Sequence, residues 1–335
     1  MSTHLSTATE AGTRTPVRPR SARQSLGWLM WRQQRLTIAL WLAVIAVAVV
    51  AFPFLRSEMV DYIDTKHIAG CAEISLDPRC QGVGMQQAVE QFRESYGLLI
   101  KGIGLLLLLL PAMAGVFVGA PLFARELESG TWRLVLAQSV GRRRWTAAKL
   151  VTAGLVGALG SATLMMLYRW LWQPSANDVS GVAWSARVFI VSGGPVLIAT
   201  VLLALAVGAT VGALLGRVVP AMGVTLAVVA ALQYGMSVVR PYLWSSETML
   251  VPRSSLPNDV WGFGQGYQLP DGTRLAIDAC TSSSDYAACL GNAREYSEVH
   301  RASDYWPLQG VESGICLVLA AALVVFLLVR TRRSV

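Results

Sequence analysis

Residues 102–124 read Gly-Ile-Gly-Leu-Leu-Leu-Leu-Leu-Leu-Pro-Ala-Met-Ala-Gly-Val-Phe-Val-Gly-Ala-Pro-Leu-Phe-Ala and carry no charge over 23 positions. A helix rises about 1.5 Å per residue, so this run can cross a bilayer core about 30 Å thick. Five other uncharged runs are 17 to 29 residues long: 36–55, 150–168, 188–216, 218–239 and 313–329. A buried core helix could imitate one such run, but not six. The sequence therefore predicts an all-α polytopic membrane protein with six transmembrane helices.

The composition of the whole chain agrees with this class. Of 335 residues, 54% are hydrophobic and only 14% are charged, whereas a soluble globular protein has about 25% charged residues. These values disfavour a water-soluble enzyme of this size. They also exclude intrinsic disorder for most of the chain, because disorder requires low hydrophobicity.

Two features divide the long apolar region 188–239. Gly193, Gly194 and Pro195 predict a break or kink near the start of the fourth span. Arg217 alone separates the fourth span from the fifth, and Pro220 follows it. We therefore expect a tight helical hairpin at this position.

The distribution of charge predicts the orientation in the membrane. With the N-terminus in the cytoplasm, the cytoplasmic segments sum to +13 and the opposite face to −5, which accounts for the net charge of +8. An excess of Arg and Lys marks the cytoplasmic side. We expect both termini in the cytoplasm, a location in the cell membrane, and no role in binding nucleic acid.

The spans and charges together predict an order of segments. Residues 1–24 resemble a disordered tail. In residues 25–35, Trp28, Met30 and Trp31 alternate with polar residues, which favours an interfacial helix; an aromatic belt at the end of the first span is the alternative. The predicted spans are residues 36–55, 97–124, 150–172, 188–216, 218–239 and 309–329. The predicted outer loops are 56–96, 173–187 and 240–308, and the inner segments are a loop at 125–149 and a tail at 330–335.

Four of the five cysteines lie in the two long outer loops. Cys71 and Cys80 bracket eight residues, and so do Cys280 and Cys289. Outer loops face an oxidising compartment, so local disulfides are favoured, each stabilising the fold by roughly 2–4 kcal/mol. A metal site is the weaker alternative. With the aromatic residues of loop 240–308, the disulfides predict a stapled extracytoplasmic cap, whereas Cys316 in the last span is a packing residue.

The sequence lacks motifs that are typical of ATP-binding proteins and of hydrolases. It has no Gly-x-x-x-x-Gly-Lys-Ser/Thr phosphate loop, no Gly-x-Ser-x-Gly elbow and only three histidines. The spans carry no charge at mid-depth, where ion-coupled carriers usually have one. We therefore expect neither an enzyme nor an ion-coupled carrier.

The inner loop carries the most specific pattern in the chain. The residues that form it are Arg125, Glu126, Glu128, Gly130, Thr131, Gln138, Ser139, Val140, Arg142, Arg144, Trp145 and Lys149. This pattern resembles the permease subunits of ATP-binding-cassette exporters of the type-2 export class, and more narrowly those of actinobacteria. Residues 31–35 and 305–309 resemble the starts of the first and last spans in the same family.

The resemblance implies a role for the inner loop and a set of partners. In the family, this loop carries a short helix that docks on a separate cytoplasmic ATPase subunit, which binds ATP and Mg. A second permease, identical or different, completes the membrane unit together with membrane lipids. No cofactor or metal is expected in this chain. We expect Gly130 and Thr131 to form a break between two short helices. The predicted ATPase-coupling residues are Arg125, Glu126, Glu128, Gly130, Thr131, Arg133, Gln138, Ser139, Val140 and Arg142.

Three charged residues are predicted near the outer membrane boundary: Lys101, Arg169 and Glu312. Charges there are either paired or extended toward water. We hypothesise that Glu312 pairs with Lys101, Arg169 or Arg240 and helps hold an outer gate shut. Extension of the side chains toward water is the alternative.

The predicted function is a permease subunit that couples ATP hydrolysis by its partner to export. Its spans are rich in Leu, Val, Ala and Gly, which favours an amphiphilic or hydrophobic substrate such as an antibiotic, a peptide or a lipid-like molecule. A membrane-anchored sensor with a ligand-recognising cap is the alternative, and an exporter whose cap regulates release is a third possibility.

Overall fold

The computed structural model describes residues 22–71, 78–130, 141–176, 179, 181–257, 259–281 and 289–333, without the side chains of residues 22–38 and 331–333. The predicted disordered tail lies outside these residues except for positions 22–24, which already belong to a helix.

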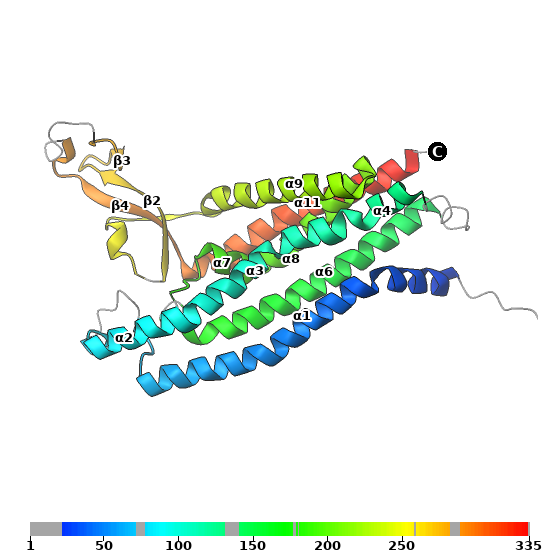
Figure 1. Cartoon of the computed structure of the whole chain (residues 1–335). Helices are drawn as coiled ribbons and strands as arrows, with labels where there is room; N and C mark the ends of the chain where they lie inside the picture. Colours follow the sequence, from blue (N-terminus) through cyan, green and yellow to red (C-terminus); the bar gives the residue numbers. More distant parts are fainter. Residues whose placement is uncertain are drawn as a thin grey trace, which may run out of the picture.

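Six helices in the described part of the chain are long and apolar enough to cross a membrane, which confirms the predicted number of spans. They are centred on α1 (Ala22–Lys66), α3 (Leu98–Ala114), α6 (Arg142–Trp172), α8 (Val196–Leu215), α9 (Val218–Val239) and α11 (Tyr305–Arg333). Figure 1 shows them side by side as an elongated bundle.

Helix α3 is the middle of a longer helical rod. It follows α2 (Val83–Phe92) and the π-helical turn η2 (Arg93–Gly97), and it continues through a second π-helical turn, η3 (Gly115–Gly119), into α4 (Pro121–Ser129). The rod extends beyond the predicted span at both ends. It therefore connects the two ends of the bundle without an interruption.

Residues 25–35 do not form a helix of their own, because they are the first turns of the continuous helix α1. Figure 1 shows the beginning of α1 bending relative to the rest of the helix. Helix α1 also runs to Lys66, beyond the predicted end of the span at residue 55. The location of residues 25–35 at a membrane surface stays a prediction.

Helix α8 lies at the centre of the bundle and packs against α3, α4, α6, α9 and α11. Small residues permit this close packing. A Cβ atom built on Gly208 would collide with the carbonyl oxygen of Gly115, and one on Gly212 would collide with that of Ala120. The backbones of α8 and of the η3–α4 segment therefore touch directly.

The predicted break and hairpin are both confirmed. Helix α7 (Arg187–Ser192) ends at Gly193, and α8 begins after Pro195. At the other end of α8, Gly216 adopts a left-handed conformation with φ of 63°, and Arg217 precedes the first turn of α9. A glycine tolerates this conformation without a steric penalty.

The prediction of an all-α fold is wrong for residues 247–301. They form a four-stranded antiparallel sheet with strand order β1-β4-β2-β3. The strands are β1 (Glu247–Met249), β2 (Val260–Gln268), β3 (Arg274–Ala276) and β4 (Arg294–Arg301). Strand β2 is rich in aromatic and β-branched residues, which suit a pleated, half-buried surface. The sequence predicts that these aromatics belong to a cap, and it does not predict strands.

The sheet is attached to the helix ends by buried polar contacts. The Trp184 indole Nε1 donates to the Asp259 carbonyl oxygen over 3.0 Å. On β4, the Nε2 of His300 lies 2.8 Å from the Pro241 carbonyl oxygen, and its ring stacks on Phe263 with centroids 5.0 Å apart. These contacts fix one end of the sheet to the end of α9 and to the segment that precedes α7.

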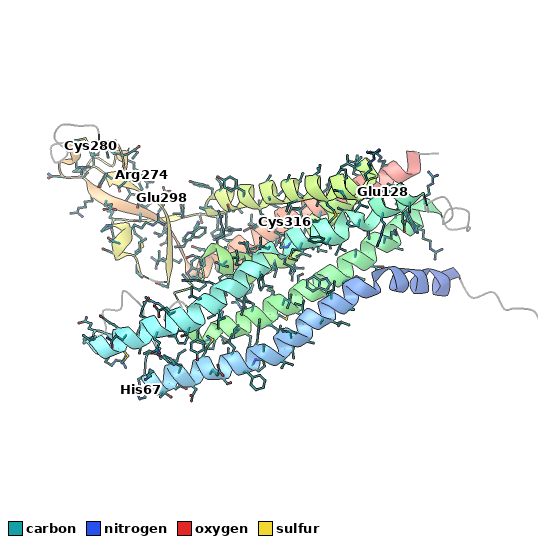
Figure 2. The ribbon with its side chains drawn as sticks, viewed as in Figure 1. His67, Glu128, Arg274, Cys280, Glu298 and Cys316 are labelled. Atoms are coloured by element: carbon teal, nitrogen blue, oxygen red, sulfur yellow. A yellow bond between two sulfur atoms is a disulfide. The ribbon has the colours of Figure 1, made fainter. Side chains whose placement is uncertain are left out.

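Both predicted disulfides are confirmed. Cys71 is bonded to Cys80, and Cys280 to Cys289. Cys316 is free and buried on α11, as expected for a packing residue. Figure 2 shows Cys280 at the far tip of the sheet and Cys316 among the helices.

Candidate functional site

The two ends of the bundle differ, and each holds part of the predicted site. We define the inner end as the end where α1 begins and α11 finishes, and the outer end as the end that carries the sheet (Figure 1). Helix α4 points to the inner end. The break between α7 and α8 lies at the outer end.

A buried ion pair joins α4 to α6 at the inner end. The Glu126 Oε1 atom lies 2.5 Å from the Lys149 Nζ atom, and both side chains are largely buried. The same ammonium donates to the Leu122 carbonyl oxygen over 3.0 Å and lies 4.4 Å from the centre of the Trp145 ring. These additional contacts stabilise the charge of a lysine that is removed from water.

Glu128 joins α4 to a third helix. Its Oε2 atom accepts a hydrogen bond of 2.9 Å from the backbone N–H of Val218, the first residue of α9. The first N–H groups of a helix have no partner within the helix and carry a partial positive charge, so a carboxylate stabilises them. Figure 2 shows Glu128 at the inner end.

The other predicted coupling residues fall into two groups. Arg125 is exposed on α4, Arg142 begins α6, and Gly130 ends α4 in a left-handed conformation with φ of 70°. Helix α4 thus ends at Gly130, and the second short helix predicted after it falls outside the described residues. Thr131, Arg133, Gln138, Ser139 and Val140 lie outside the described residues.

At the outer end, Glu312 forms a buried ion pair with Arg240. The distances are 2.6 Å between Arg240 Nε and Glu312 Oε2, and 2.7 Å between Arg240 Nη2 and Glu312 Oε1. This two-point geometry is the strong form of an arginine–carboxylate contact. The pair joins the end of α9 to the first turns of α11. Of the three cations that the sequence offered to Glu312, the structure selects Arg240.

The other two cations at the outer end have different surroundings. Lys101 is exposed on α3. Arg169 donates to the Gly193 carbonyl oxygen over 3.1 Å and to the Tyr305 hydroxyl over 3.4 Å, and its guanidinium lies 4.9 Å from the centre of the Trp306 ring. Arg169 therefore ties the break between α7 and α8 to the start of α11.

Comparison with known proteins identifies the family. A family model described as ABC-2 membrane transporter related matches residues 40–240. The chain belongs to this family. The matched region includes the first five spans and the inner loop, and it ends before the sheet. Neither the curated proteins nor the solved structures gave a match to this ABC-2 protein.

Two polar residues of the ABC-2 protein hold helices together but were not predicted as site residues. Lys149 was noted only as part of the loop pattern. Gln309 donates through Nε2 to the Ile190 carbonyl oxygen over 2.5 Å and accepts through Oε1 from the Val196 N–H over 3.2 Å. Each is a polar residue at the edge of an apolar run, which is the signal that could have revealed it.

The described residues of this ABC-2 protein contain no group of three His, Cys, Asp or Glu side chains that could hold a metal ion. The polar contacts described above connect helices instead. Their arrangement suits a protein whose helices must move together.

Proposed function

We propose that the chain is the transmembrane permease subunit of an ATP-driven exporter. Separate cytoplasmic ATPase subunits would bind ATP and Mg, and a second permease, identical or different, would complete the membrane unit. The single observation that carries the proposal is the attachment of α4, which leads into the inner loop, to both α6 and α9. Family membership supports a membrane subunit without an ATPase site of its own. The loop pattern supports the finer resemblance to actinobacterial permeases.

The attachments of α4 suggest how movement is passed on. An ATPase that docks on the loop 125–149 would push on α4. Because Glu126 binds Lys149 and Glu128 binds the start of α9, α6 and α9 would follow. The loop residues from Thr131 to Arg142 would form the rest of the docking surface.

The outer end would act as the gate. In the described conformation, the Arg240–Glu312 pair holds the outer end of α9 against α11. Breaking this pair would let the outer ends separate and release an amphiphilic or hydrophobic substrate. The chain would sit in the cell membrane with both termini in the cytoplasm, in agreement with the excess of Arg and Lys at the inner end.

Reconstitution tests the proposal directly. The chain should co-purify with a phosphate-loop ATPase in mild detergent, and the pair in liposomes should transport an amphiphile only with ATP and Mg. Arg125→Glu should weaken both, because Arg125 is exposed on α4. Arg253→Glu is the matched control, since Arg253 is an exposed arginine at the other end of the molecule. Transport that persists without ATP, from a chain that binds no ATPase, would contradict the proposal.

The sheet supports one extension of this function. It is attached to the outer end of α9 and to the segment before α7, so a cap that regulates release is the second candidate. A membrane-anchored sensor receives less support, since the family is one of transporters.

A further inference from the structure

An apolar cavity lies between α3, α8, α9 and α11 in the described part of the chain. Its volume is about 450 Å³, within the usual range of sites for small molecules. Leu203, Val229 and Leu319 are among its walls. The amide of Gln233, which also lines it, already donates to the Leu108 carbonyl oxygen over 3.1 Å. The walls therefore favour a hydrocarbon chain.

The polar residues of the cavity gather at its outer end. Arg240 is neutralised there by Glu312. Arg187, on the first turn of α7, is exposed and donates to the Ser237 hydroxyl over 2.7 Å; no carboxylate of the described residues pairs with it. The outer end of the cavity therefore carries one uncompensated positive charge.

We propose that this cavity binds an anionic amphiphile, with its head group on Arg187 and its apolar chain between the helices. From the outer end of the bundle inward, the lining of the cavity changes from charged to apolar. A lipid of the outer leaflet has its head group and its hydrocarbon chain in the same order. The side chains of Leu109 on α3 and Tyr234 on α9 also line the cavity and are 47% and 67% exposed, so the cavity opens sideways between these helices. An amphiphile in the bilayer enters by this route.

The walls named above belong to helices of one chain, so the site is proposed for the permease by itself. Binding requires neither ATP nor an ATPase. Two sources share the required chemistry: a single-chain anionic cargo, and an anionic phospholipid of the bilayer. The experiment includes an arm for each source.

The test is photolabelling of the purified chain in phosphatidylcholine nanodiscs. The first probe is palmitic acid with a diazirine in mid-chain, and the second is phosphatidylglycerol with the same group. Palmityl alcohol with the diazirine is the neutral control. Mass spectrometry then locates the labelled peptides, which should come from α3, α8, α9 and α11.

Two pairs of variants make the test specific. Gly235→Phe places a ring at the cavity, and Gly223→Phe places the same ring elsewhere on α9; a Cβ atom meets nothing within 4 Å at either position. Gly235→Phe should abolish labelling, and Gly223→Phe should preserve it. Arg187→Gln should reduce labelling about tenfold, the loss typical of a hydrogen bond to a charged group. Arg253→Gln should not reduce it.

The outcomes separate the possibilities. Labelling by palmitic acid alone supports a single-chain cargo, and labelling by phosphatidylglycerol supports a bilayer lipid; both support the site. Equal labelling by palmityl alcohol, or labelling that Gly235→Phe does not change, overturns it. Labelling that persists in a chain without ATP-driven transport refutes the proposed function alone.

Discussion

At the scale of single residues, the Glu126–Lys149 pair shows how a charge can be kept at the edge of an apolar helix. Removing two charges from water costs free energy, and the attraction between them offsets this cost only with good geometry and further hydrogen bonds. Lys149 has both, since its ammonium contacts Glu126, the Leu122 carbonyl oxygen and the Trp145 ring. The pair therefore orients α4 and α6 relative to each other.

This argument predicts a non-additive mutant cycle. Glu126→Gln and Lys149→Met should each lower the free energy of unfolding by about 3–5 kcal/mol, because each leaves one buried charge without its partner. The double variant should lose much less than the sum. Thermal unfolding in detergent measures the three values. Additive losses would show that the two side chains do not interact.

The outer ion pair gives a second prediction, which compares Glu312 with the exposed Lys101. Glu312→Gln should lower the unfolding temperature and increase transport without ATP, because Arg240 loses its partner. Lys101→Gln should leave the unfolding temperature unchanged, since Lys101 is exposed. Thermal unfolding and a leak assay in liposomes check both variants. If Glu312→Gln changed neither quantity, the outer gate would have to lie elsewhere.

At the scale of elements, close packing of backbones sets the position of α8. The η3 turn approaches α8 so closely that Gly208 cannot hold even a methyl group. Backbone contact of this kind gives van der Waals attraction between helices where lipid provides no hydrophobic drive. We therefore expect η3, α4 and α8 to move as one body.

A pair of glycine variants tests this packing. Gly208→Ala should destabilise the fold by about 1–3 kcal/mol, the usual cost of overpacking. Gly223→Ala on α9 should be neutral or stabilise by up to about 1 kcal/mol, because its Cβ atom has open space and alanine favours a helix. Unfolding temperatures of the two variants provide the measurement. A harmless Gly208→Ala would mean that the two backbones can separate at no cost.

At the scale of the whole molecule, one disulfide lies in the helical bundle and the other lies at the sheet, and their surroundings differ. The two disulfides close loops of equal length, each with a sequence separation of 9. Cys71 and Cys80 are both buried in the main hydrophobic core with Ile68 and Met59. Cys280 is buried at the tip of the sheet (Figure 2), whereas its partner Cys289 is exposed.

We therefore predict unequal losses from the two disulfides. Each disulfide restricts the unfolded chain and thereby stabilises the fold by about 2–4 kcal/mol. This contribution should be similar for the two disulfides because their loops are equally long. Cys71→Ser with Cys80→Ser should cost more than Cys280→Ser with Cys289→Ser, because it also places two hydroxyls in an apolar core. Unfolding temperatures under oxidising conditions measure both. The opposite order would show that the sheet, rather than the bundle, limits stability.

The sequence by itself determined the spans, the break at residues 193–195, the hairpin at Arg217 and the two disulfides. Each depends on local composition or short spacing, and apolar runs of this length have few alternatives in a bilayer. Only the tertiary structure decided which cation meets Glu312, 72 positions from Arg240, and that Glu126 meets Lys149. It also decided the pairing of β2 with β4. The physical reason is the same in each case, because these contacts depend on how distant segments pack and no local pattern specifies that packing.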